Sequence, residues 1–183
     1  MDSQIRLWLD SEYEELLDTM SREFYATYRE QSSEDAMKVL REQIRDVQVL
    51  GVGSGRAVIS LPTEAYSAGQ YDGYVVKLAV PNTEFVELDG IEQNMRERNV
   101  WEESNNGVRT YLTPVVAAGA DGYWVVMPCG TPLEEGSMDG FDEWKTEAAD
   151  ALEGVVPDDD IESSNVTVID GEFQLCDYGV SPN

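Results

Sequence analysis

Residues 160–179, which read DIESSNVTVIDGEFQLCDYG, constrain the fold more than any other stretch of the chain. Two short runs of alternating apolar residues flank the dipeptide Asp170-Gly171, a pattern that predicts a β-hairpin with a two-residue turn. A hairpin brings its two ends together. We therefore expect Asn165, before the first strand, to lie beside Asp177, after the second.

This pair predicts a metal site. Asn165 and Asp177 offer hard oxygen ligands, of the kind that a phosphate-bound Mg²⁺ takes from one or two protein side chains. Asp160 precedes Asn165 by five residues on the same loop. It would be available there as a general base.

The segment resembles the catalytic loop and metal-binding motif of protein kinases, in which D-L-x-x-x-N is followed by D-F-G. The corresponding residues here are D160-I-E-S-S-N165 and D177-Y-G179. The resemblance implies that Asp160 is the catalytic base, that Asn165 and Asp177 hold Mg²⁺, and that the nucleotide is ATP.

The composition points to a high-salt environment. The 183 residues suffice for one core, or for one domain with a small extension. They include 37 acidic and 12 basic residues, for a net charge of −25, and the only lysines are Lys38, Lys77 and Lys145. Salt screens such self-repulsion, so we expect a halophilic archaeon or its virus as the source. An acidic DNA mimic would need its acids on one face, whereas here they are spread along the chain.

The same charge excludes several partners. Without a basic stripe, the chain is not expected to bind nucleic acid or an anionic membrane.

The N-terminal residues lack the pattern of a signal peptide, and no apolar run is long enough to span a membrane. We expect a cytoplasmic protein in a high-salt interior, or one associated with a virion. Two cysteines and no histidine leave carboxylates, lysine and hydroxyls as the available chemistry.

The first 48 residues predict a helical extension. Apolar residues recur with helical spacing over residues 3–30, and a second helix is predicted over residues 33–47, with Ser32 or Ser33 as its N-cap. These helices would pack against the following sheet. A role in binding a partner or in oligomerisation is the alternative.

A glycine-rich turn follows, with Gly51, Gly53 and Gly55 between two predicted strands. Glycine lets the backbone approach a phosphate closely, although such turns also join strands without any ligand. Compared with the kinase motif G-x-G-x-x-G-x-V, Gly51, Gly53 and Val58 are in place. Arg56 occupies the third glycine position, and Gly55 comes one residue early.

Lys77 interrupts the apolar strand predicted over residues 74–80. It would either point outward into solvent or, by resemblance to the kinase motif V-A-I-K, hold the nucleotide phosphates and pair with a glutamate on a helix. A helix is predicted over residues 91–103. Glu97 is the first choice for this glutamate and Glu92 the second, whereas an ordinary surface pairing of Glu92 with Arg96 is the alternative.

Two strands are predicted next, over residues 111–118 and 122–127, and the second leads into M127-P-C-G130. By the resemblance, Met127 is the gatekeeper, and adenine contacts the Pro128 carbonyl and the Gly130 N–H. The alternative is a strand end followed by a turn. A polar link over residues 131–140 and a helix over residues 141–152 would lead to Asp160.

Together these motifs predict an α+β protein-kinase-like domain over residues 49–183. Its N-lobe, about residues 49–130, would hold a five-stranded antiparallel sheet and one long helix, and residues 131–183 would form a reduced C-lobe. Asp158 and Asp159 replace the usual His and Arg, and Glu162 replaces the usual Lys. With only four residues after Gly179, we expect no activation segment and no peptide-binding helices.

Three functional interpretations remain open at this stage. The chain is an ATP- and Mg²⁺-dependent phosphotransferase, whose substrate comes from a partner protein, the N-terminal helices or a small molecule. Alternatively, it is an inactive pseudokinase-like module that binds nucleotide or acts as a scaffold in a larger, viral or cellular, assembly. A third interpretation is a structural protein that binds no nucleotide.

Overall fold

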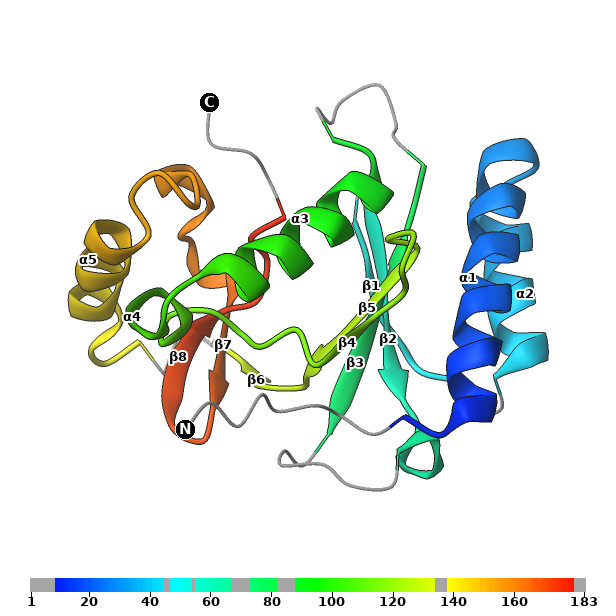
Figure 1. Ribbon diagram of the computed structural model, residues 1–183, viewed down its shortest axis with the longest axis horizontal. Coiled ribbons are helices and arrows are strands. Elements are labelled where there is room, and N and C mark those ends of the chain that lie inside the picture. Colours follow the sequence, from blue (N-terminus) through cyan, green and yellow to red (C-terminus); the bar gives the residue numbers. More distant parts are fainter. Residues whose placement is uncertain are drawn as a thin grey trace. The chain divides into compact units, whose positions relative to one another are not determined.

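The computed structural model describes residues 9–44, 47–53, 55–66, 73–81, 88–133 and 138–179, and shows an α+β protein (Figure 1). The chain divides into two compact units. The first unit comprises Met1–Met95 and Val115–Cys129, and the second unit comprises Arg96–Pro114 and Gly130–Asn183. Because α3 spans Gly90–Glu103, it begins in the first unit and ends in the second.

The other α-helices are α1 (Ser11–Glu30), α2 (Ser33–Gln43), α4 (Asn106–Arg109) and α5 (Phe141–Ala151). The strands are β1 (Val49–Val52), β2 (Arg56–Leu61), β3 (Tyr74–Ala79), β4 (Ala117–Ala118), β5 (Trp124–Pro128), β6 (Thr131–Pro132), β7 (Val166–Ile169) and β8 (Glu172–Leu175). Three short 3₁₀ helices are η1 (Thr63–Ala65), η2 (Asp158–Asp160) and η3 (Ser163–Asn165).

The first unit contains a five-stranded antiparallel sheet in the order β1-β2-β3-β5-β4. This confirms the expected α+β class and the five-stranded antiparallel sheet. Successive side chains along a strand point to opposite faces, so each strand gives one set of residues to each face. One face contributes Ile59, Val76, Leu78, Trp124 and Val126 to the hydrophobic core.

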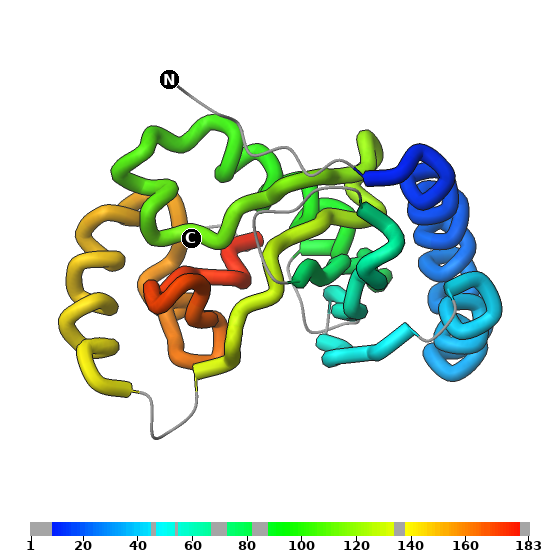
Figure 2. Tube along the Cα trace, turned by 90° about the horizontal axis from the view of Figure 1, so that it is seen from below, coloured from blue at the N-terminus to red at the C-terminus, as the bar shows by residue number. Residues whose placement is uncertain are grey.

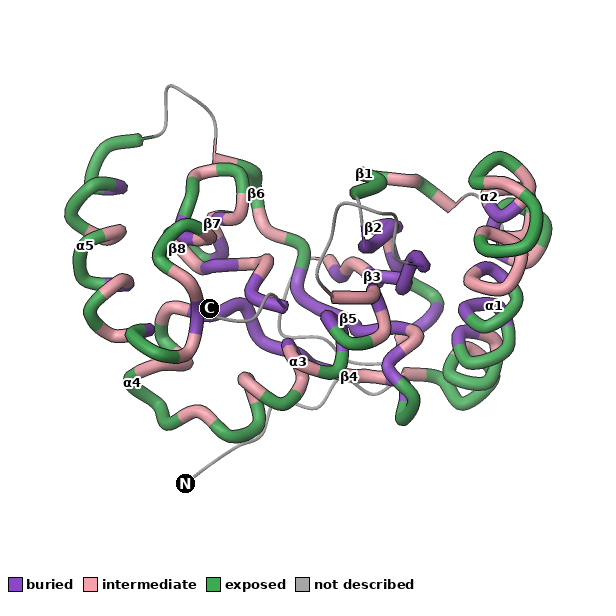
Figure 3. The backbone as a smooth tube through the Cα atoms, turned by 90° about the horizontal axis from the view of Figure 1, so that it is seen from above, coloured by how far each residue is buried: buried purple, intermediate pink, exposed green. Residues whose placement is uncertain are grey.

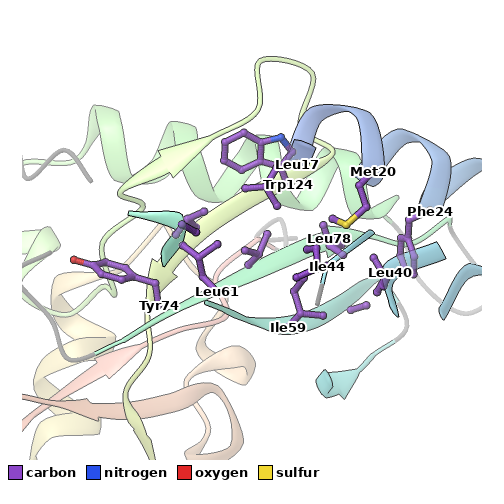
Figure 4. Packing of buried hydrophobic residues seen from close by; sticks show 14 of the residues in the cluster. Leu17, Met20, Phe24, Leu40, Ile44, Ile59, Leu61, Tyr74, Leu78 and Trp124 are labelled. Atoms are coloured by element: carbon purple, nitrogen blue, oxygen red, sulfur yellow. The ribbon is translucent and has the colours of Figure 1, made fainter. Parts of the chain in front are cut away.

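The helices α1 and α2 lie side by side and pack on this core face (Figure 2). Leu17, Met20 and Phe24 of α1 and Leu40 of α2 have no exposed surface and pack against the sheet residues (Figure 4). Each buried Leu or Phe contributes about 1.5–3 kcal/mol to stability. The apolar faces of both helices are therefore used within the first unit.

Both helices are shorter than the sequence predicts. Asp10 caps α1 by accepting the N–H of Glu12, and Leu9 forms an isolated bridge with Tyr66, so the helix begins at Ser11. Residues 3–8 of the predicted helix lie outside the described residues. Ser32 caps α2 as predicted, but that helix ends at Gln43, not at residue 47, because Ile44 turns to an extended conformation.

The second unit contains a three-stranded antiparallel sheet in the order β6-β7-β8. The predicted hairpin is confirmed: its turn residues Asp170 and Gly171 both have positive φ, 53° and 87°. Two positive φ values are what a two-residue turn of this kind requires. Figure 3 shows that many residues of α5 are exposed and that most residues of β7 are buried.

Two predictions about connecting segments are wrong. The expected polar link over residues 131–140 begins with β6, because Thr131 pairs with Val168 across the sheet. The expected strand over residues 111–118 is reduced to β4, because Leu112 forms only an isolated bridge to Leu175.

Membrane-spanning helices are absent from the described part of the chain, where no helix is both long enough and apolar enough.

Candidate functional site

Three candidate site residues of the first unit, Val58, Lys77 and Met127, lie on the sheet face opposite α1 and α2. Lys77 pairs directly with Val58 on one side and Val125 on the other, and Val75 pairs with Met127. Because directly paired residues share a face, Val58, Val75, Lys77, Val125 and Met127 form one surface, which we call the Lys77 face.

Lys77 is buried on this face, with 6% of its surface exposed. The outward-pointing, solvated lysine considered from the sequence is therefore wrong. Its strand is tied to α3, because Asn94 donates one side-chain N–H to the Lys77 carbonyl at 3.3 Å and one to the Gly122 carbonyl at 3.0 Å. A buried ammonium needs compensating charge or hydrogen bonds, which makes Lys77 a candidate anion-binding residue.

The three glycines of the β1–β2 turn differ in what surrounds them. A Cβ on Gly51 would meet nothing within 4 Å, and one on Gly53 would only touch the Arg56 carbonyl at 3.7 Å. A Cβ on Gly55 would meet the end of the Gln93 side chain, which would have to move aside to admit a larger residue. The turn is closed by the Gly53 N–H, which donates to the Arg56 carbonyl at 2.7 Å.

The predicted hinge residues are divided between the two units. Met127 and Pro128 end β5 and are buried in the first unit, where Pro128 pairs with Tyr74. Gly130 belongs to the second unit, and a Cβ there would collide with the Thr167 side chain. The local packing therefore accounts for glycine at position 130 without any ligand.

The second unit brings Asp160, Asn165 and Asp177 together. Asp160 ends η2 and Asn165 ends η3, and the Asn165 side chain donates an N–H to the Asp160 carbonyl at 2.9 Å. The Asn165 carbonyl accepts the Cys176 N–H at 2.7 Å, which fixes the residue next to Asp177. The hairpin therefore brings Asn165 close to the Asp177 segment, as expected. The contact is the hydrogen bond between Asn165, just before β7, and Cys176, just after β8.

Negative charge accumulates around Asp160. Burial raises its pKa, and the carboxylates of Asp177, Asp159 and Glu162 raise it further. Its Oδ2 atom is buried and has no hydrogen-bond partner in the described part of the chain. An environment of this kind disfavours the ionised carboxylate unless a cation is close by.

Asn165 and Asp177 are candidate ligands for a divalent cation. Asn165 uses its N–H in the bond to Asp160, which leaves its side-chain oxygen as a ligand, and Asp177 supplies a carboxylate. No group of three or more His, Cys, Asp or Glu side chains suited to a metal occurs among the described residues. Mg²⁺ needs no such group when it is bound to a nucleotide, because phosphate and water complete its coordination.

Glu97 is fully buried in the second unit. Its Oε1 accepts the backbone N–H of Tyr178 at 3.2 Å, and the Tyr178 hydroxyl donates to the Thr113 carbonyl at 2.7 Å. Glu97 therefore holds the segment that begins with Asp177. The second choice, Glu92, is exposed and accepts the Asp89 N–H at 3.0 Å at the start of α3, an ordinary helix-capping role.

Two residues of these surfaces were not anticipated from the sequence. Val75 shares the Lys77 face, which its position two residues before Lys77 in a strand would have indicated. Tyr178 anchors the candidate metal-binding motif through both its N–H and its hydroxyl. No local sequence signal identifies Glu97 and Thr113 as the partners of Tyr178, because both are distant from it in the chain.

Comparison of the sequence with models of known protein families and with curated proteins gives no match.

Proposed function

We propose that this chain is an ATP- and Mg²⁺-dependent phosphotransferase of the protein-kinase-like type. The observation that carries the proposal is the convergence of Asp160, Asn165 and Asp177 in the second unit. A base, an amide and a carboxylate in this order along the chain are the set that such phosphoryl transfer uses.

The first unit supports the same function. A buried lysine on a five-stranded antiparallel sheet, preceded by a glycine-containing turn and followed by a long helix, fits the kinase-like N-lobe that the resemblance implies. We assign Lys77 to the nucleotide phosphates, and Val58, Val75 and Met127 to the apolar surface for the base. Gly51 and Gly53, which have open space or ordinary contact at Cβ, are the turn residues that can approach phosphate.

In this proposal Asp160 accepts the proton of the acceptor hydroxyl, while Asn165 and Asp177 would hold Mg²⁺. Mg²⁺, when bound, offsets the charge on the phosphates. Glu97 keeps the Asp177 segment in place through the Tyr178 N–H. The acceptor belongs to a protein partner or a small molecule, and we infer a high-salt cytoplasm or a virion as the setting from the net charge of −25.

A second candidate is a nucleotide-binding module without turnover. It is favoured by the acids around Asp160, since Asp159 and Glu162 add negative charge where a transferring phosphate needs the opposite. The two candidates share Mg-ATP binding and differ only in turnover.

Thermal unfolding with and without Mg-ATP in molar KCl, followed by an assay of ATP turnover, separates these functions. A ligand at 100 times its Kd stabilises by about 2.7 kcal/mol, which shifts the midpoint by several degrees. We expect this shift in the wild type and in Asp150→Ala, an exposed control on α5, but not in Asp177→Ala. Turnover lost in Asp160→Asn identifies the enzyme, and binding without turnover identifies the module. No shift in the wild type would refute both.

A further inference from the structure

Two buried cations occupy one face of the first unit's sheet. Arg56 and Lys77 are each 6% exposed, and they are the buried basic side chains among the described residues. Burying a charge is costly, and this chain has 12 basic residues to distribute against 37 acidic ones. The burial of two of these basic residues on one face therefore points to a role for that face.

The strand register makes Arg56 and Lys77 neighbours. Arg56 pairs with Ala79 and Val58 pairs with Lys77, so Arg56 and Lys77 are diagonal neighbours on adjacent antiparallel strands. Ala57 and Leu78, which alternate with them, point into the hydrophobic core on the other face. Diagonal neighbours on one face are separated by about 7–8 Å, within reach of two long side chains.

This spacing suits an anion with several charged oxygens. Two cations on one face of a poorly solvated site favour an anion that contacts both, because Coulomb attraction is stronger there than in water. Arginine offers a planar fork of donors that matches phosphate oxygens, and lysine adds a compact charge. A chain of two or three phosphates can contact both side chains, whereas a single carboxylate is too short to contact both.

We propose that Arg56 and Lys77 together bind the oligophosphate of the ligand, with Arg56 as a second phosphate-binding cation. That this oligophosphate belongs to a nucleotide rests on the proposed function. Arg56 stands at the third glycine position of the turn motif, where it adds a second positive charge to the Lys77 face. The ligand class is a nucleoside di- or triphosphate, and a free polyphosphate has the same binding chemistry.

The test uses the full chain and three probes without Mg²⁺: tripolyphosphate, ATP and adenosine. Thermal unfolding is measured for the wild type, Arg56→Gln, Lys77→Gln, Arg56→Lys and the control Arg41→Gln, an exposed arginine on α2. Each shift is taken relative to the same variant without ligand, so that a change in intrinsic stability does not count as a change in binding. We expect tripolyphosphate and ATP to stabilise the wild type and Arg41→Gln. Binding should weaken at least tenfold in both glutamine variants and partly recover in Arg56→Lys.

The probes distinguish the two sources of the oligophosphate. Tighter binding of ATP than of tripolyphosphate indicates a nucleotide, and equal binding indicates polyphosphate alone. The binding of adenosine, which carries no phosphate, should not change in Arg56→Gln. If tripolyphosphate does not bind the wild type, or binds Arg56→Gln as well as the wild type, the inference is wrong and Arg56 is structural.

Failure of this inference is separable from failure of the proposed function. The inference alone would be supported if tripolyphosphate binding depends on Arg56 and Lys77 while the protein shows no turnover and no Mg-ATP response that depends on Asp177. Turnover that is unchanged by Arg56→Gln would support the function and overturn the role of Arg56.

Discussion

The backbone N–H of Tyr178 donates a hydrogen bond to Oε1 of Glu97, 3.2 Å away. Glu97 lies on α3 and Tyr178 directly follows Asp177, so this bond connects a helix to the candidate metal-binding motif within the second unit. The resemblance assigned Glu97 to pairing with a lysine. The bond to Tyr178 gives Glu97 a structural role that is independent of any nucleotide.

The first prediction concerns this bond. Glu97→Ala should destabilise the protein by about 2–4 kcal/mol, because it leaves a buried N–H without an acceptor and opens a cavity. Glu97→Gln retains a side-chain oxygen and should cost less. Thermal unfolding of both variants without ligand measures the difference. If both variants lose the same stability, the contribution of Glu97 comes from its carboxylate charge and not from its hydrogen bond to Tyr178.

The second prediction concerns pH. The pKa of Asp160 is raised by burial, then by Asp177, Asp159 and Glu162, so the folded protein binds a proton more tightly than the unfolded chain does. Stability attributable to Asp160 is therefore highest below its unfolded pKa, about 3.9, and decreases as the pH rises through the folded value. At neutral pH the ionised side chain destabilises the fold.

Asp160→Asn should consequently raise the unfolding midpoint at about pH 7 and have little effect below about pH 4. Asp142→Asn, an exposed change on α5, serves as the control. Urea or thermal unfolding over this pH range provides the measurement. A variant that is less stable than the wild type at neutral pH would contradict the assigned electrostatics.

The third prediction tests why α3 begins with glycine. A Cβ on Gly90 would meet the backbone carbonyl of Gly55 and lie 2.6 Å from N and 2.7 Å from O of Val80. Backbone atoms cannot move aside as a flexible side chain can, so Gly90→Ala should cost about 3 kcal/mol or slightly more. Gly51→Ala, where nothing lies within 4 Å, should change stability by less than about 1 kcal/mol. Similar losses in both variants would contradict this account.

Local patterns in the sequence predicted much of this structure. Alternation around Asp170-Gly171 identified the β7–β8 hairpin, and the hairpin placed Asn165 near the Asp177 segment, as observed. Lys77 was placed in the correct strand, and α3 was predicted to within one residue at its start. These features depend on interactions between residues close in the chain.

Features that depend on distant pairing were not predicted. β6 exists because Thr131 meets Val168, and residues 111–116 are not a strand, since Leu112 finds only an isolated partner in Leu175. Apolar composition alone made this segment resemble a strand. The helix α4 was also missed, although Asn105, which caps it, is a residue that often begins helices.

The last prediction concerns the attachment of α3 to α1 in the first unit. The Tyr25 hydroxyl donates to Oδ2 of Asp89 at 2.6 Å, and Oδ1 of Asp89 accepts the Ile91 N–H at 2.8 Å in the first turn of α3. One carboxylate therefore caps α3 and joins it to α1. A hydrogen bond to a charged group contributes about 1.5–3 kcal/mol, and a helix cap contributes about 1 kcal/mol.

Asp89→Ala should lose both contributions, about 2–4 kcal/mol in total, while Tyr25→Phe should lose only the first. Because the single variants remove the same bond, their effects should not add, and the double variant should be about as stable as Asp89→Ala. Tyr28→Phe is the control, since Tyr28 is half-buried and its hydroxyl makes no hydrogen bond within the described residues. Additive losses in the double variant would show that Tyr25 and Asp89 stabilise the protein separately, and that α3 is not held to α1 through this bond.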